Sequence, residues 1–198
     1  LTSGAAITDS AALTVSGTFA ATTEDNDGLI NMGSLAVDGT IALTTDGTGN
    51  ATIVNDTAID FAASTVGGEL SSTVTNGHTT QSAGLTITGA ATFISTAASK
   101  NIVLTHADNV FTSTVEFQAG AAGGAAIGNV GLRDSAAIKL DDDIDTAGDF
   151  LVDAATDWTI GGTLIVYAET GTITQGTAIS VAGTSAFTTE ADNAAITL

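Results

Sequence analysis

The chain of 198 residues carries three Lys and Arg side chains against 22 Asp and Glu, which gives a formal net charge of −19 at neutral pH. Nucleic-acid binding depends on cationic side chains at phosphates, so this charge excludes a nucleic-acid partner and disfavours an anionic lipid surface. The absence of Cys excludes disulfides and thiolate metal sites. No apolar run approaches the roughly 20 residues of a membrane helix, so we expect no direct membrane insertion.

Apolar side chains alternate with Thr, Ser, Ala or Asp in short segments along the whole chain. Gly, Asn, Asp and Ser fill the gaps between these segments, and such residues favour turns. This period of two predicts short β-strands with one buried face, and nothing in the sequence predicts a helix. In chain order the predicted strands are centred on 13–15, 35–37, 41–43, 59–61, 85–87, 102–104, 115–117, 130–132, 138–140, 150–152, 158–160, 164–166, 179–181 and 196–198.

The sequence repeats itself at a distance of 94 residues. Residues 80–89 read TQSAGLTITG and residues 174–183 read TQGTAISVAG, while an earlier copy at 8–17 reads TDSAALTVSG. We therefore divide one continuous domain, 1–198, into repeat units at about 8–79, 80–173 and 174–198, the last one incomplete. The repeat predicts equivalent core positions, which pair Phe93 with Phe187, Leu85 with Ile179 and Ile87 with Val181.

Short strands, in a repeat that tolerates the loss of about one coil, predict an all-β solenoid. A solenoid stacks each coil on its neighbour, so the loss of one coil between two repeat units is harmless. A barrel would not lose a strand so freely, because its strand number and shear are linked. At roughly 20 residues per coil, we expect about 8 to 10 coils. Neither end of the chain reads as a polar cap, so we expect either a piece of a longer rod or a chain that stacks end to end.

Four stretches carry a family resemblance, namely 80–93, 101–111, 129–140 and 172–198. Their cassette resembles the repeats of filamentous-haemagglutinin-like adhesins, which are very large bacterial surface proteins secreted by the two-partner route. The resemblance implies a right-handed parallel β-helix and an extended stalk on the cell surface. Residues 20–50 and 141–170 depart from the cassette, so we expect less regular coils there.

The densest acidic cluster is a candidate Ca²⁺ site. It consists of Asp141, Asp142, Asp143 and Asp145, and carboxylate oxygens in a turn suit this ion. The cluster lacks the glycine and the closing glutamate of an EF-hand loop, so a solvated acidic turn is the competing interpretation. Trp158 and Tyr167 are candidate carbohydrate contacts, with core packing as their alternative.

Few residue patterns in the sequence indicate a catalytic function. Arg133 and Lys139 lie close in sequence to the acidic cluster, which is the equipment of a Ca²⁺-dependent polysaccharide lyase, although a site for a polyanion normally needs more positive charge. The two imidazoles, His78 and His106, do not have the spacing of a zinc motif. We therefore expect no catalytic residues and no cofactor other than the candidate Ca²⁺.

The leading hypothesis is a structural, non-catalytic β-solenoid segment of a bacterial extracellular adhesin or surface filament, which provides reach and display. The alternative is a subunit of a self-assembling extracellular fibre or sheath that stacks end to end, and the remote alternative is the lyase. The expected partners are adjacent coils or copies of the same protein and a glycan or protein receptor on a host or cell surface. The expected location is the bacterial cell surface.

Overall fold

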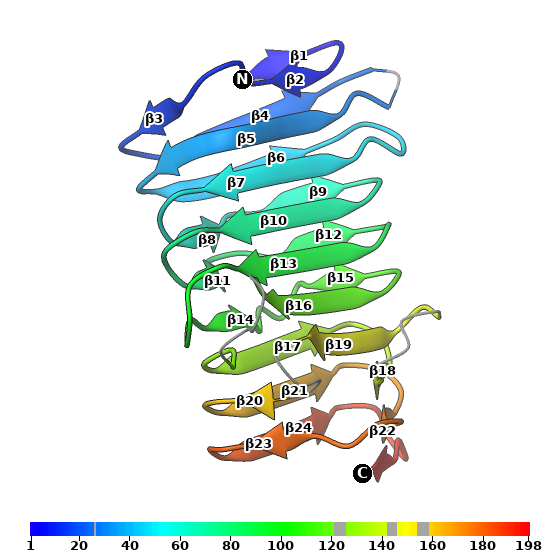
Figure 1. Ribbon diagram of the computed structural model, residues 1–198. Helices are drawn as coiled ribbons and strands as arrows, with labels where there is room; N and C mark the ends of the chain where they lie inside the picture. Colours follow the sequence, from blue (N-terminus) through cyan, green and yellow to red (C-terminus); the bar gives the residue numbers. More distant parts are fainter. Residues whose placement is uncertain (26, 121–125, 142–145, 154–158) are drawn as a thin grey trace.

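A computed structural model describes residues 1–25, 27–120, 126–141, 146–153 and 159–198. These residues form a β-solenoid of about nine turns spaced roughly 21 residues apart, and they contain no helix. The coil is right-handed, with the N-terminus at one end of the rod and the C-terminus at the other (Figure 1). The predicted all-β parallel solenoid is therefore confirmed. Within the described residues there is no helix long and apolar enough to cross a membrane.

Two large parallel sheets and one small sheet form the walls of the rod. The 12-stranded sheet contains β1 (Thr2–Ser3), β4 (Phe19–Thr23), β6 (Thr40–Thr44), β8 (Ile59–Phe61), β9 (Ser64–Val66), β11 (Thr79–Gln81), β12 (Leu85–Ile87), β14 (Ile102–Leu104), β15 (Val110–Phe111), β17 (Val130–Asp134), β21 (Leu164–Ala168) and β24 (Ser185–Thr189). The 11-stranded sheet contains β2 (Ile7–Thr8), β3 (Leu13–Val15), β5 (Ile30–Val37), β7 (Ala51–Asn55), β10 (Leu70–Val74), β13 (Ala91–Ser95), β16 (Val115–Ala119), β19 (Asp149–Asp153), β18 (Ile138–Leu140), β22 (Ile173–Gln175) and β25 (Ile196–Thr197). The small sheet pairs β20 (Thr159–Ile160) with β23 (Ser180–Val181).

Alternation of side chains builds a narrow apolar core inside the rod. In β13, Ala91 and Phe93 are buried while Thr92 between them is partly exposed, because successive side chains point to opposite faces of a strand. Parallel register brings like positions together, so Phe93 of β13 pairs with Phe117 of β16. The rings of Phe61, Phe93, Phe117 and Phe150 follow one another in edge-to-face contacts, with centroids 4.9 to 5.9 Å apart.

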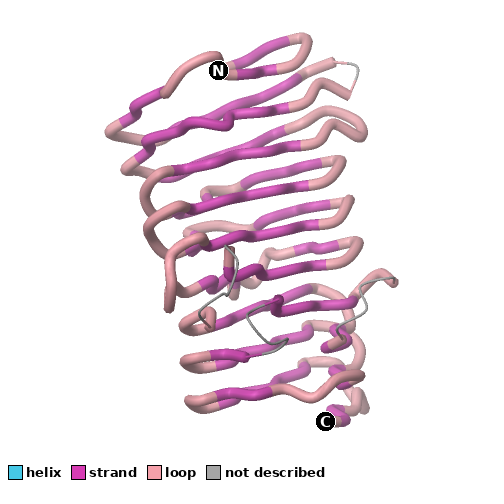
Figure 2. The backbone as a smooth tube through the Cα atoms, in the orientation of Figure 1, coloured by secondary structure: helices cyan, strands magenta, loops and turns pink. Residues whose placement is uncertain are grey.

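The long strands form a wide face that passes from one sheet to the other at β17. Near the N-terminus long strands lie in both sheets, namely β4 and β6 in the 12-stranded sheet and the eight-residue β5 in the 11-stranded sheet, and in the middle they lie in the 11-stranded sheet (β7, β10, β13, β16 and β19). From β17 onward they return to the 12-stranded sheet as β17, β21 and β24, with β17 stacked on the short strand β14. Figure 2 shows the continuous stack of strands on both sides of this exchange.

The exchange separates positions that are equivalent in the sequence. Phe93 lies in the 11-stranded sheet and Phe187, 94 residues later, lies in the 12-stranded sheet. Leu85 and Ile87 are fully buried in β12 of the 12-stranded sheet. Their sequence equivalents are Ile179 and Val181. Val181 lies in β23 of the small sheet, and Ile179 directly precedes this strand. Both side chains are partly exposed and pack against the core.

The N-terminal segment is more regular than expected. Residues 20–50 contain most of β4 and all of β5 and β6, which stack in parallel register. One irregularity occurs between Met32 and Leu35, where the register of β5 shifts against β7. The carboxylate of Asp9 accepts hydrogen bonds from the backbone N–H groups of Gly33 and Ser34, at 3.0 and 2.7 Å, and so satisfies the donors that this bulge leaves without a ladder partner.

Candidate functional site

The candidate Ca²⁺ cluster is only partly within the described residues, because Asp142, Asp143 and Asp145 lie outside them. Asp141 directly follows β18 and forms an ion pair with the ammonium of Lys139. Asp149 of β19 is the register partner of Lys139, and its Oδ1 lies 3.7 Å from the Lys139 Nζ. The geometry of Asp141 is therefore that of an ion pair with a neighbouring strand residue.

Asp149 has a local structural task as well. Its side chain is 1% exposed, and its Oδ2 accepts hydrogen bonds from the backbone N–H and the hydroxyl of Thr146, at 2.8 and 2.7 Å. These contacts fix the start of β19, next to the positive φ of Gly148. Among the described residues no group of three or more His, Cys, Asp or Glu side chains is arranged to hold a metal ion.

Tyr167, one of the two candidate carbohydrate contacts, belongs to a cluster on the outside of the 12-stranded sheet. Arg133 of β17 is its register partner, and the guanidinium carbon of Arg133 lies 4.0 Å from the centre of the Tyr167 ring. Arg133 also forms a salt bridge of 2.9 Å with Glu169, and the Tyr167 hydroxyl donates a hydrogen bond to Glu190. One ring face is thus occupied by the guanidinium, which leaves less of the ring for stacking on a sugar. Trp158, the other candidate, lies outside the described residues.

The acidic neighbours of Tyr167 alter its acidity. The hydrogen bond to Glu190 raises the pKa of the Tyr167 hydroxyl, with smaller upward contributions from desolvation and from the charges of Glu190 and Glu169, while Arg133 lowers it. The hydroxyl therefore stays protonated at neutral pH as a donor to Glu190. These four residues, Arg133, Tyr167, Glu169 and Glu190, are called the Arg133 cluster. A salt bridge, a cation–π contact and a hydrogen bond in this cluster join three coils.

The two imidazoles occupy turns and accept backbone hydrogen bonds. The Nδ1 of His78 accepts a bond of 2.9 Å from the N–H of Asn101 in the next coil. The Nδ1 of His106 accepts one of 3.2 Å from the N–H of Asp108, whose carboxylate lies 3.7 Å away. The Nδ1 of His78 therefore joins two coils, while that of His106 holds a local turn.

Buried polar side chains at the corners of the coil are the residues that the sequence analysis did not single out. Asn55 ends β7 and is fully buried, and its amide donates to the carbonyls of Val37 and Ala58 while its Oδ1 accepts from the N–H of Val37. Asn109 precedes β15 and bonds to Gln81 and to backbone groups of three coils. A signal existed in the sequence, since each follows or precedes an alternating segment at a turn.

Asp134 is the acidic member of this set. It ends β17 as Asn55 ends β7, it is 3% exposed, and its Oδ1 accepts bonds of 2.9 Å from the N–H of Phe111 and 2.7 Å from that of Ser135. Burial raises its pKa, and the backbone hydrogen bonds oppose this shift. The carboxylate thereby covers the open edge of β15, which has a strand partner only on its β12 side.

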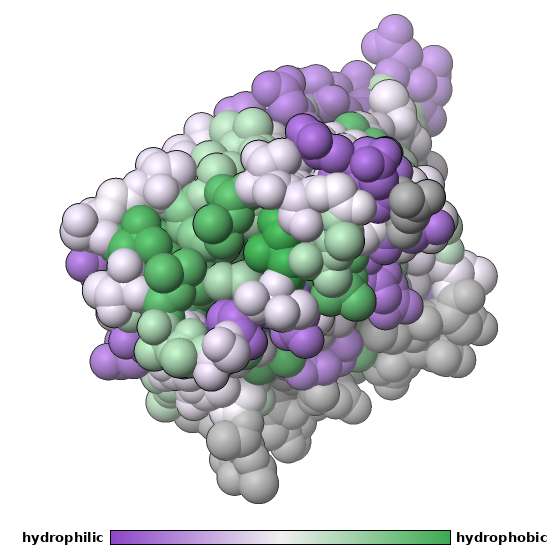
Figure 3. Space-filling view, turned by 90° about the horizontal axis from the view of Figure 1, so that it is seen from above, coloured by the Kyte–Doolittle hydropathy of each residue, from purple (hydrophilic) through white to green (hydrophobic). Residues whose placement is uncertain are grey.

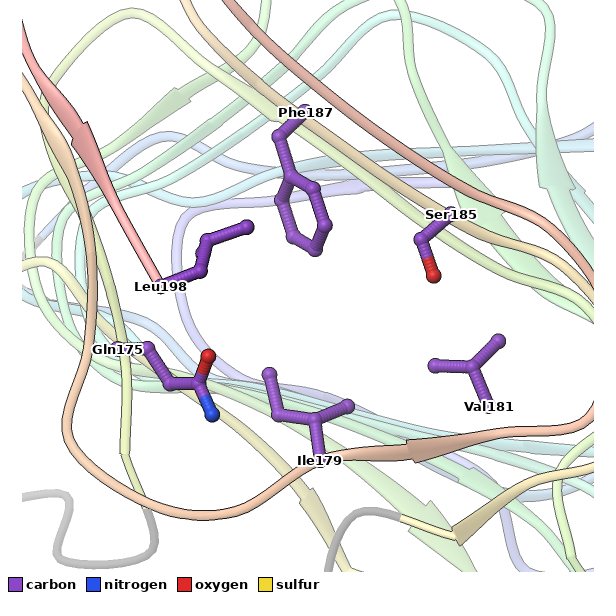
Figure 4. A pocket seen from close by; sticks show the side chains of 6 residues that line it. All are labelled: Gln175, Ile179, Val181, Ser185, Phe187 and Leu198. Atoms are coloured by element: carbon purple, nitrogen blue, oxygen red, sulfur yellow. The ribbon is translucent and has the colours of Figure 1, made fainter.

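A hollow of about 300 Å³ opens at the C-terminal end of the rod. Figure 4 shows that the side chains around it point into the bore from the different sides of the last turn. Its lining combines apolar and polar side chains and consists of Gln175, Ile179, Val181, Ser185, Phe187 and Leu198. Three of these side chains, at 179, 181 and 187, are the later members of the predicted core pairs. They line the open cross-section of the core.

The fold and these contacts define the class of the protein as a β-solenoid repeat protein. Residues 48–118 and residues 127–198 each match the model of a family described as repeats of unknown function (DUF5649). The two matches cover most of the chain, which therefore belongs to this family. No curated protein and no solved structure matches the chain.

Proposed function

We propose that this chain is a structural, non-catalytic segment of a bacterial extracellular adhesin or surface filament, whose work is reach and display. The observation that carries the proposal is the continuous apolar interior, which runs from Ile7 in the first coil to Ile173 near the last as one cluster. Each coil pairs in parallel with the next, so the backbone hydrogen bonds lie along the axis of the rod. Such a rod keeps its length without help from a ligand.

The use of polar side chains supports a mechanical role. Asn55, Asn109 and Asp134 bond to backbone groups inside the coil corners. Arg133 and Lys139 are each held by a carboxylate of a neighbouring segment or residue. Groups that could otherwise serve a substrate are thus already engaged in holding coils together.

The bacterial and extracellular part of the proposal rests on the resemblance of the repeats to filamentous-haemagglutinin-like adhesins. The net charge of −19 agrees with this setting, since like-charged rods repel one another in dilute salt and remain apart. A receptor on a host or cell surface, either a glycan or a protein, is the proposed partner of the parent protein. The Ca²⁺ site at Asp141, Asp142, Asp143 and Asp145 stays a prediction, because three of these four residues lie outside the described ones.

Antibodies against the purified chain test this proposal on the bacterium that produces it. The expected result is gold label on intact cells, at a distance from the outer surface that reports reach, and loss of label after external protease. Cells from which the gene has been deleted are the control. Label that appears only after the cells are permeabilised would contradict the extracellular role.

A subunit that stacks end to end is the second candidate function, and one observation favours it. The first and last described coils present the cross-section of the apolar core, as Figure 3 shows on one side and the hollow around Phe187 shows on the other, and a further coil in parallel register would cover it. Exposed strand edges of this kind are templates for pairing with another chain.

A further inference from the structure

An amine and two carboxylates meet where β18 lies against β19. Lys139 and Asp149 are register partners on these parallel strands. The Lys139 Nζ forms an ion pair with Asp141 and lies 3.7 Å from the Oδ1 of Asp149. The side chain of Asp149 is 1% exposed, whereas that of Lys139 is 43% exposed. An amine that approaches from the surface therefore meets a carboxyl group that is shielded from water.

Thr146 holds the carboxyl group of Asp149 from another side. Its backbone N–H and its hydroxyl donate to the Asp149 Oδ2, at 2.8 and 2.7 Å, and its carbonyl accepts the Asp149 N–H at 3.1 Å. Two fixed donors on one oxygen stabilise a tetrahedral intermediate at the attached carbon, because the negative charge develops on that oxygen. Oδ2 is thus in the place of an oxyanion, and Oδ1 is the oxygen within reach of the amine.

We infer that Lys139 and Asp149 form an intramolecular amide bond between their side chains, with Asp141 as the group that moves the protons. The reaction begins from an ammonium and a carboxylate. Asp141 passes one proton from the Lys139 Nζ to the Asp149 Oδ1, which leaves an amine beside a carboxylic acid. Burial favours this neutral pair, because a charge away from water is costly.

The bond forms through a tetrahedral intermediate. The Lys139 Nζ attacks the Cγ of Asp149, and the electron pair of the C=O bond moves to Oδ2, where the two donors of Thr146 stabilise it. Asp141 removes a proton from the attacking nitrogen and delivers it to Oδ1, whose bond to Cγ breaks. One amide and one water are the products, and the reaction consumes no oxidant, reductant or cofactor.

The folded chain favours this condensation through proximity. Groups that are held together in a suitable orientation reach effective concentrations of up to about 10⁵–10⁸ M. A hollow of about 110 Å³ adjoins the reacting groups, with Lys139, Thr146, Asp149 and Thr174 in its lining. A water molecule has a volume of roughly 30 Å³ in the liquid, so the hollow has room for the released water.

The amide would strengthen a weak point of the rod. β19 follows β18 in the chain but lies between β16 and β18 in the 11-stranded sheet. The register of β18 with β19 consists of Lys139 with Asp149 and Leu140 with Phe150, which is a short ladder. A covalent bond across this ladder goes beyond the proposed structural role and would serve it, since it holds the two strands together under load.

The intact mass of the purified full chain tests the inference directly. We expect a mass that is lower by one water than the sequence requires, and this loss should survive denaturation. Trypsin does not cleave after an acylated lysine, so residues 134–198 should remain one peptide when the denatured chain is digested. Lys139→Arg keeps a cation and should restore the full mass. Lys100→Arg, at the other lysine of the chain, is the matched control and should leave the loss of water unchanged.

The outcomes separate the amide from an ion pair and from other losses of water. A folded chain with its full mass overturns the inference and leaves Lys139 and Asp149 as an ion pair only. A loss of water that persists in Lys139→Arg overturns it as well, because a cyclic imide at an Asp-Gly pair such as Asp38-Gly39 has the same mass.

The role of Asp141 has a separate measurement. Asp141→Asn should slow the loss of water after refolding, and a rate equal to that of the unmodified chain would contradict the proton transfer assigned to Asp141. Circular dichroism checks that each variant is folded, and the mass of the unmodified chain decides the inference even where a variant fails to fold. This measurement does not involve the cell surface, so the failure of the amide and the failure of the proposed function are distinguishable.

Discussion

The carboxylate of Asp134 accepts a hydrogen bond of 2.9 Å from the backbone N–H of Phe111. This bond joins the end of β17 to β15, which has no partner among the described strands on that side. Its pKa is raised by burial above the ordinary 3.8. A folded-state pKa above the unfolded one means that the fold binds the proton more readily. The contribution of Asp134 to stability is therefore greatest at low pH and is lost as pH rises through the raised pKa.

Asp134→Asn should stabilise the fold at neutral pH and remove this part of the pH dependence. The amide keeps an oxygen for the N–H of Phe111 and adds a donor, as Asn55 has at the same strand position. An increase in the free energy of unfolding, and so in the melting temperature, is expected at pH 7. Asp108→Asn, on a side chain that is 83% exposed, is the control. A lower melting temperature for Asp134→Asn at pH 7 would contradict the account.

Phe117→Ala should be among the most damaging substitutions in the rod. Phe117 is fully buried, and its ring contacts Phe93 on one side and Phe150 on the other. Loss of a buried ring leaves a cavity and costs about 3–5 kcal/mol. Chemical denaturation measures this loss, with Phe117→Leu as the milder comparison. A change below that of the exposed substitution Ile165→Ala would show that the ring stack does not hold the coils.

Gly67→Ala tests the close approach of successive coils. A Cβ at Gly67 would overlap the carbonyl oxygen of Gly47 in the coil above, so the two backbones must separate to admit it. Destabilisation of about 1–3 kcal/mol is expected. Gly17 offers a matched control, because a Cβ there meets nothing within 4 Å. Equal melting temperatures for Gly67→Ala and Gly17→Ala would contradict the coil spacing.

Tyr167 provides a spectroscopic test, since it is the single tyrosine of the chain. Glu190→Gln removes the charge that accepts its hydrogen bond and should lower the pKa of the hydroxyl toward its ordinary 10.0. Arg133→Gln should raise it further, because the guanidinium lowers it. Ultraviolet titration follows the phenolate directly, with Glu116→Gln as the distant control. Unchanged titration in both variants would show that the Arg133 cluster does not form in solution.

The remote lyase alternative has a direct assay. Lys139 is engaged by Asp141 and lies near the buried carboxylate of Asp149, an arrangement in which it stabilises β18 against β19. We expect no unsaturated product from polygalacturonate or alginate, with or without Ca²⁺. Product that disappears in Lys139→Ala, while the melting temperature is retained, would establish the lyase instead.

Most of the strands could be predicted because their period of two is local. Leu85-Thr86-Ile87 and Ile138-Lys139-Leu140 each form a three-residue strand whose first and last side chains are buried. The sheet to which a strand belongs could not be predicted, since every side of the coil has the same alternation. Phe93 and Phe187, which are equivalent in the repeat, lie in different sheets although their local sequences are alike.

The polar corners escaped prediction for a related reason. Asn55 lies between apolar Val54 and a turn, and Asn is equally common in exposed turns. Only the path of the neighbouring coil, which brings the backbone of Val37 within reach, makes it a buried capping residue. The Arg133 cluster has the same origin, since Arg133 and Tyr167 are 34 residues apart and meet through strand register.

Both family-matched segments form one continuous rod, in which β17 is stacked on β14. Cysteine pairs test this most directly in a chain that has no native cysteine. Val103→Cys with Gly131→Cys joins register neighbours on these strands and should form a disulfide on mild oxidation, as should the control pair Thr92→Cys with Glu116→Cys. Glu116→Cys with Gly131→Cys should stay reduced. A disulfide in this last pair, and none between 103 and 131, would contradict the exchange of the wide face and the continuous rod built on it.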